Sequence, residues 1–263
     1  MAPILRPHSE PRRRTGRPPV PVLPAVLPVA LAGRVVEVRL RVNARARRMT
    51  LRLPIGTAGP VITVPPRVSE AVVRGFLESH REWLETRLAR RPAATPFADG
   101  AEIPFRGTPH RIVHDGRLRG GVRTAAGQDG ASLIVVSGEP SVLARRVSLF
   151  LRREAEAALK EAVHRHTAAL GVTAAAVRIR DTTSRWGSCS CDRVLSFSWR
   201  VVMAPPFVLN YLVAHEVAHL REMNHSPAFW RIVARLDPQA RQGRAWLKQH
   251  GPHLHAIGAQ PDA

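Results

Sequence analysis

The chain has 263 residues, 44% of them hydrophobic, so it can form one large or two small domains and is not globally disordered. Forty Lys and Arg against 20 Asp and Glu give a formal net charge of +20, which attracts polyanions without defining a dedicated partner. Cys189 and Cys191 are too close in sequence for a good intramolecular disulfide. This excludes a disulfide framework and favours a reducing, cytoplasmic compartment.

Residues 1–33 are predicted to form a disordered leader rich in Pro and Arg. Three arginines, 12–14, precede an apolar stretch that ends near Gly33, an arrangement that resembles a signal peptide. Prolines interrupt this stretch repeatedly, whereas the core of a signal peptide is normally helical, so a disordered leader is favoured. No apolar run in the chain is long enough to cross a bilayer, and no membrane partner is expected.

Residues 34–140 are predicted to form a β-rich, basic part with one helix. Apolar and basic residues alternate from Arg34 to Leu53, which is typical of half-buried strands. The expected elements are a hairpin over 34–53 with its turn near 43–47, a strand over 61–64, a helix from Ser69 to about Arg90, a linker over 91–100 and short strands within 103–136. This part contains no catalytic constellation.

Residues 141–250 are predicted to form a second domain, followed by a flexible tail over 251–263. The expected elements are a helix over 141–170 with Gly171 as its C-cap, strands over 177–180 and 194–200, and helices from Pro205 to about Met223, over 227–236 and over 239–250. Together the two parts predict an α+β fold.

The motif that carries chemistry is His215-Glu216-Val217-Ala218-His219, on a predicted helix with apolar neighbours. Two His four residues apart differ by about 40° around a helix, so both imidazoles can bind one ion at about 2.0–2.1 Å. Glu216 would then lie beside the ion, where it can accept a proton from metal-bound water. The alternative, two histidines merely packed on a helix, is disfavoured because this motif should arise by chance only ~0.03 times per chain of this length.

His225 is the best candidate for the third ligand of a zinc site that keeps an open position for water. On a continuous helix it would lie out of reach of His219, so the chain must turn between them. Asn224 can end a helix in the left-handed conformation, and Ser226 with Pro227 can begin the next one. The alternative is an exposed loop histidine.

Other reactive residues are weaker candidates. His164, His166, His250, His253 and His255 are expected at the surface rather than as ligands. For Cys189 and Cys191, small buried or loop thiols are favoured over a metal site, because no second cysteine pair completes four ligands. Tyr211 could donate to a tetrahedral intermediate, but a core tyrosine is favoured.

The second half of the chain resembles the YgjP-like metallopeptidases. The segments that carry the resemblance are residues 184–189, 195–200, 203–206, 211–220 and 224–230. Weaker likeness at 45–53, 64–66 and Trp83 extends the resemblance to about residues 34–250. It implies a compact zincin-like unit whose HExxH helix packs on a small sheet, with His215, His219 and His225 binding Zn²⁺ and Glu216 as the base.

The resemblance also suggests kinship with SprT-type proteases, which act on proteins attached to DNA. The spacing of the three histidines equals that of metzincins, but Glu222 replaces the glycine those enzymes need at the bend, and no methionine turn is evident. The chain is therefore not assigned to the metzincins.

The predicted function is hydrolysis of peptides or unfolded proteins by a zinc-activated water, with Glu216 as general base. One alternative is a nucleic-acid-associated protein whose basic N-terminal half binds nucleic acid and whose metal site is structural, or a protease recruited to nucleic acid by that half. Another is a zinc hydrolase that acts on a different amide.

Overall fold

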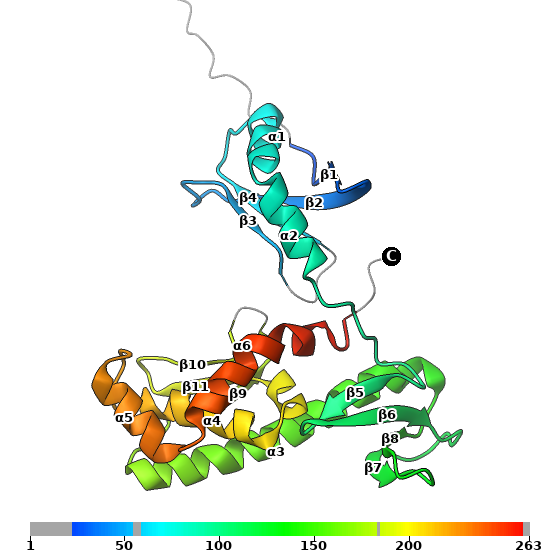
Figure 1. Ribbon diagram of the computed structural model, residues 1–263, viewed down its shortest axis with the longest axis vertical. Coiled ribbons are helices and arrows are strands. Elements are labelled where there is room, and N and C mark those ends of the chain that lie inside the picture. The colour runs from blue at the N-terminus through cyan, green and yellow to red at the C-terminus, as the bar shows by residue number, and fades with distance from the viewer. Residues whose placement is uncertain (1–22, 55–58, 183–184, 260–263) are drawn as a thin grey trace, which may run out of the picture. The chain divides into compact units, whose positions relative to one another are not determined.

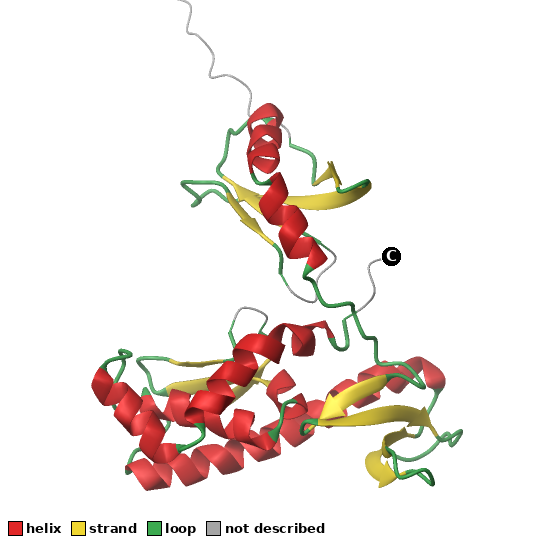
Figure 2. Cartoon of the chain, viewed as in Figure 1, coloured by secondary structure: helices red, strands yellow, loops and turns green. Residues whose placement is uncertain are grey.

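The computed structural model describes residues 23–54, 59–182 and 185–259 (Figure 1). Most of the predicted leader, and Ser184 of the first matching segment, lie outside these residues. Contacts divide the chain into two units, one ending near Glu82 and the other beginning near Trp83, with residues 53–60 belonging to the second. The predicted α+β class is confirmed, since an N-terminal sheet precedes helices and small sheets (Figure 2).

The first unit contains a four-stranded sheet with the order β1-β2-β4-β3. Its strands are β1 (Val26–Leu31), β2 (Arg34–Val42), β3 (Thr50–Arg52) and β4 (Val61–Val64). The predicted hairpin of β2 with β3 is wrong, because β4 lies between them. The hairpin is instead β1 with β2, turning at Ala32 and Gly33, which both have positive φ. Residues 26–33 are therefore ordered, contrary to the predicted leader.

One face of this sheet packs against α1 (Glu70–Ser79). Its core consists of buried aliphatic side chains: Leu27, Val38, Ile62, Val64, Val73 and Leu77. Ser69 caps α1 as predicted, accepting a hydrogen bond from the Val72 amide at 3.4 Å. The helix does not continue to residue 90, because His80 leaves the helical conformation (φ −112°, ψ 14°) and α2 (Arg81–Ala89) begins after it.

The second unit begins with a four-stranded sheet of order β5-β6-β8-β7. The strands are β5 (Glu102–Phe105), β6 (Thr108–His114), β7 (Val122–Ala126) and β8 (Ser132–Val136), which confirms the short strands predicted for 103–136. The long helix α3 (Leu143–Leu170) follows and ends at Gly171 in the left-handed conformation, as predicted. Leu143 and Val147 share one hydrophobic core with Ile112 and Ile134, so the structure has no domain boundary at residue 140.

The remaining elements surround the HExxH motif. They are β9 (Ala176–Arg180), β10 (Gly187–Cys189), β11 (Val194–Ser198), a 3₁₀ segment (Trp199–Met203), α4 (Pro206–Ala218), α5 (Pro227–Leu236) and α6 (Ala240–Ala256). The strands form a sheet of order β10-β11-β9, and α4 packs on β10, α3 and α6 (Figure 1).

Two predicted helix ends are wrong here. Helix α4 ends at Ala218, and α6 runs through Pro252 to Ala256. The second extension occurs because Leu254 and His255 are buried, so residues 251–256 are packed rather than a flexible tail. Within the described part of the chain, no helix has the length and apolarity that a membrane crossing requires.

Candidate metal centre

The turn that follows α4 brings His225 back toward the HExxH helix. His219 is the C-cap residue of α4, with helical φ and ψ of −65° and −19°. The Asn224 side chain accepts a hydrogen bond from the Ser226 amide at 2.9 Å, and Ser226 caps α5 by accepting from the Phe229 amide at 3.3 Å. The predicted cap at Ser226 is confirmed. The predicted left-handed Asn224 is wrong, because the helix has already ended and Asn224 is not among the described residues with positive φ.

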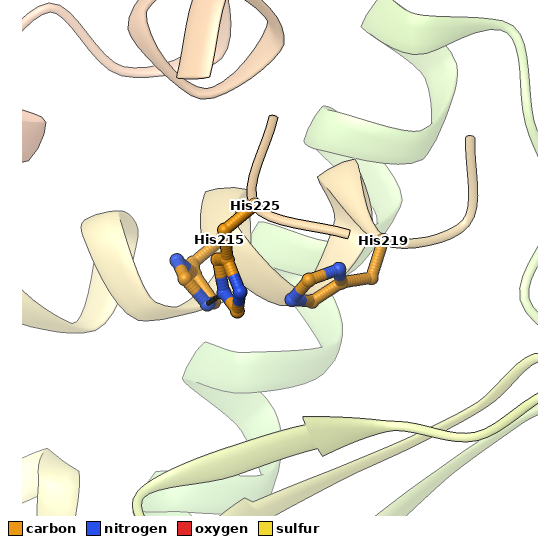
Figure 3. Close-up of side chains that lie close together, drawn as sticks. All are labelled: His215, His219 and His225. Atoms are coloured by element: carbon orange, nitrogen blue, oxygen red, sulfur yellow. Dashed lines mark hydrogen bonds between the residues drawn. The ribbon is translucent and has the colours of Figure 1, made fainter. Parts of the chain in front are cut away.

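The three predicted ligands lie together (Figure 3). Their candidate ligand nitrogens are all within 4.8 Å of one another. The Nε2 atoms of His215 and His225 are 3.2 Å apart, and the ring centroids of His219 lie 5.0 Å and 4.8 Å from those of His215 and His225. Among the described residues, this is the one group of three or more His, Cys, Asp or Glu side chains that could hold a metal ion.

Burial lowers the pKa of His215 and His219, and a hydrogen bond orients the His219 ring. Burial lowers the pKa of His215 to about 4, with the neighbouring charges of His219 and His225 adding to the effect. The Nδ1 atom of His219 lies 3.0 Å from the carbonyl oxygen of Glu222. Because a carbonyl only accepts, Nδ1 carries the hydrogen and Nε2 keeps its lone pair for a ligand-binding role.

Glu216 is buried beside the cluster, with only 5% of its surface exposed. Burial raises the pKa of this carboxyl to about 7, against an opposing effect of Arg185. The carboxylate lies against Gly187 of β10, since a Cβ placed on Gly187 would be 2.5 Å from Oε1 of Glu216. A hollow of about 350 Å³ opens over this contact; its lining is Trp186, Gly187, Tyr211, Leu212, His215, Glu216, Arg244, Leu247 and Lys248.

Comparison with known proteins identifies the family. Residues 47–250 match the sequence profile of the YgjP-like metallopeptidase domain. The chain belongs to the YgjP-like metallopeptidase family. The matched range contains the whole histidine cluster and Glu216, and it includes strands of the first unit.

Two individual proteins are similar to parts of this YgjP-like chain. A UTP pyrophosphatase of Escherichia coli (strain K12) is 40% identical over 50 residues, which is 18% of this chain and 30% of that protein. The match thus spans less than a third of the relative's length. The metallopeptidase zymogen abylysin of Pyrococcus abyssi is 23% identical, with a TM-score of 0.31 over 34% of this chain and 93% of the other.

The donor set of this YgjP-like site fits a zinc ion. Two nitrogens that each lie 2.0–2.1 Å from one zinc at the tetrahedral angle are about 3.3 Å apart. The observed Nε2 separation of His215 and His225, 3.2 Å, matches this spacing. Nε2 is the nitrogen of His215 that faces the cluster, because it lies 3.2 Å from Nε2 of His225. The Nδ1 atom of His215 is buried and has no hydrogen-bond partner among the described residues.

Sequence reasoning missed two supports of the centre. Phe229 contacts all three imidazoles, with its ring centroid 4.4 Å from His219, 4.9 Å from His215 and 4.8 Å from His225. In the sequence, Phe229 is marked only by its place in the matching segment 224–230. The second support is Gly187, whose contact with Glu216 joins segments 29 positions apart in the sequence; its place in a matching segment was the one available signal.

The structure also places the weaker candidates Tyr211, Cys189 and Cys191. Tyr211 is buried in the core, as predicted, with its ring 5.9 Å from that of His215. Any donation from its hydroxyl stays a prediction. Cys189 is partly buried on β10 and Cys191 is exposed; both thiols are free.

Two histidines predicted at the surface are buried. The ring of His166 binds the side-chain oxygen of Asn210 at 2.9 Å, joining α3 to α4. The ring of His255 stacks on Trp186 at 4.2 Å, because α6 continues beyond its predicted end. Neither belongs to the metal cluster.

Proposed function

We propose that this chain is a zinc-dependent metallopeptidase in which His215, His219 and His225 hold Zn²⁺ and Glu216 is the general base. Membership of the family and the spacing of the histidine nitrogens support this assignment. When bound, zinc would polarise the scissile carbonyl and acidify a water molecule in the site.

Glu216 would carry the proton. Its carboxylate would accept a proton from the attacking water and return it to the leaving amine. A general base works best when its pKa lies near the operating pH, and burial brings the pKa of Glu216 to about 7. Contact with Gly187 on one side would hold the carboxylate in place beside the histidines.

The observation that favours a peptide substrate is the outer edge of β10 beside Glu216, which pairs with no other described strand. β10 is the edge strand of its sheet. Ser198 donates to Trp186 and Ser190 donates to Val194, so the paired positions alternate along the strand. The backbone N–H and C=O groups of Gly187 and Cys189 therefore point away from β11. An extended peptide that pairs with this edge would pass next to the Glu216 carboxylate.

The test is metal analysis combined with an assay on an unfolded protein. Wild type should bind about one zinc per chain and cut the protein into peptides. Glu216→Gln should retain the zinc and lose hydrolysis, because the amide cannot accept the proton. His225→Ala should lose most of the zinc, whereas His164→Ala, an exposed histidine on α3, should keep it. Full peptidase activity in Glu216→Gln would overturn the assignment.

A second candidate function is hydrolysis of a phosphoanhydride, which the similarity to a UTP pyrophosphatase favours. The same cluster could bind a metal ion that activates water against phosphorus instead of carbon. Incubating zinc-loaded wild type and Glu216→Gln with UTP and measuring released pyrophosphate distinguishes the two functions. Release by wild type without cleavage of any unfolded protein would replace the peptidase proposal.

We also propose nucleic acid as a partner of the first unit. Arg39, Arg41 and Arg52 lie on the sheet face opposite the buried Val38 and Ile62, where β2, β4 and β3 run side by side. Such a basic face favours contacts with the phosphate groups of nucleic acid. A cytoplasmic location would bring the protein together with nucleic acid. DNA binding should weaken steeply with added salt, and negligible binding at low salt would refute the proposal.

A further inference from the structure

A second hollow lies on the other side of Gly187 from the hollow over Glu216. We call it the arginine hollow; its volume is about 370 Å³ and its lining is Arg180, Thr182, Arg185, Gly187, Ser188, Ser196 and Phe197. Gly187 lines both hollows. The arginine hollow is therefore separated from the Glu216 carboxylate by one residue of an edge strand.

The polar side chains of the arginine hollow are suited to an anion. Its lining contains two guanidinium groups and three hydroxyls, and it contains no carboxylate. Ser188 and Ser196 are paired across β10 and β11, so their hydroxyls share one face of the sheet. The Thr182 hydroxyl donates to the carbonyl of Arg185 at 2.7 Å. A site made of hydrogen-bond donors and positive charge selects a ligand that accepts, such as an oxyanion.

The charges of Arg180 and Arg185 are not neutralised locally. Neither side chain forms an ion pair or a hydrogen bond with a described residue. The carboxylate that follows Arg180, Asp181, is bound by Arg200 at 2.8 Å and by Arg152 at 3.1 Å. The two guanidinium groups are thus available to a ligand that reaches the active site.

The position relative to β10 specifies which part of a substrate would enter. Side chains alternate between the two faces of a sheet, so Gly187 faces Glu216 while Ser188 faces the arginine hollow. In a peptide paired with β10, the residue beside Gly187 would face Glu216, and its immediate neighbours would face the hollow. For a nucleotide, a phosphate would take the same place.

We propose that the arginine hollow binds an oxyanion of the substrate, either a carboxylate next to the cleaved bond of a peptide or a phosphate of a nucleotide. This inference rests on the proposed function insofar as the substrate reaches Glu216 along β10. Binding of a simple oxyanion does not depend on that activity, so it can be tested separately.

The first experiment titrates zinc-loaded, full-length protein with inorganic phosphate in a calorimeter. Arg180→Ala and Arg185→Ala should each weaken phosphate binding about tenfold, as expected for a charge-assisted hydrogen bond. The control is Arg119→Ala, which removes the same charge from an exposed residue of the loop between β6 and β7, outside the hollow, and should change binding less than about twofold. Any direct contact of phosphate with zinc would be the same in wild type and the three variants, so it does not affect the comparison. Equal weakening in all three variants would overturn the proposal.

The second experiment identifies the source of the oxyanion. One arm compares peptides that differ only in Glu or Gln beside the cleaved bond, and the other measures pyrophosphate released from UTP. The result supports the peptide source if a preference for the Glu peptide falls about tenfold in Arg180→Ala and persists in Arg119→Ala. It supports the nucleotide source if UTP hydrolysis changes in that way. If wild type acts on either substrate and both Arg180→Ala and Arg185→Ala leave that activity unchanged, a substrate role for the hollow is overturned. If wild type acts on neither, the proposed function fails, while the phosphate titration still decides whether the hollow binds oxyanions.

Discussion

Replacing Gly187 by alanine should lower catalysis without removing the metal. The added Cβ would lie 2.5 Å from Oε1, 2.7 Å from Cγ and 2.9 Å from Cδ of Glu216, whereas ordinary contacts begin at 3.4 Å. The carboxylate must therefore move by about 0.9 Å, the difference between 3.4 and 2.5 Å. A displacement of about 1 Å in a catalytic group can cost about 10²-fold in rate, or about 2.7 kcal/mol of transition-state stabilisation.

The assay is kcat/KM on an unfolded protein, measured together with zinc content and melting temperature. Zinc content should match wild type, because the three atoms nearest to the added Cβ all belong to Glu216. Gly121→Ala is the control, since Gly121 lies in the same unit, its φ is not positive, and nothing lies within 4 Å of its Cβ position. If Gly187→Ala keeps kcat/KM within about twofold of wild type and still binds zinc, the reasoning about Glu216 is refuted.

Three further predictions concern buried side chains of the second unit. Phe229→Ala should destabilise the fold by about 3–5 kcal/mol and weaken zinc binding, measured by urea unfolding and chelator competition, because it removes a buried ring that contacts all three imidazoles. Arg200→Ala should cost about 3–5 kcal/mol in urea unfolding, because Arg200 is buried, binds Asp181 at 2.8 Å and donates to the carbonyls of Leu254 and Ile257; a loss below about 1 kcal/mol would contradict this. Burial lowers the pKa of His255 from 6.5 to about 4, so the unfolded chain binds more protons between these values and stability should fall by about 3 kcal/mol as pH drops from 6.5 to 4. His255→Gln should flatten that dependence, and an unchanged pH profile would show that His255 is not its source.

Local signals in the sequence predicted the parts of the structure that depend on local geometry. The spacing of His215 and His219 places both on one side of a helix, and Ser226 with Pro227 begins α5 as expected. The three histidines that these signals select are the ones that lie together. Contacts between distant segments could not be obtained in this way.

The errors have the same origin. Alternation of apolar residues locates strands β2 and β3 but does not choose their partners, and β4 separates them. Helix α4 ends at Ala218 without a glycine or proline to signal it. His255 is buried because α6 continues past its predicted end and places that ring against Trp186. In each case tertiary packing overrides a local preference.

The course of α3 has a practical consequence for dissecting this protein. Its N-terminal end is embedded in the core of the β5–β8 sheet through Leu143 and Val147, and its C-terminal half is bonded to the HExxH helix through His166 and Asn210. An expression fragment that starts at residue 140 would expose the apolar side chains of the N-terminal end of α3 and would be prone to aggregate. A shortened protein for crystallisation should therefore keep the β5–β8 sheet together with the histidine cluster.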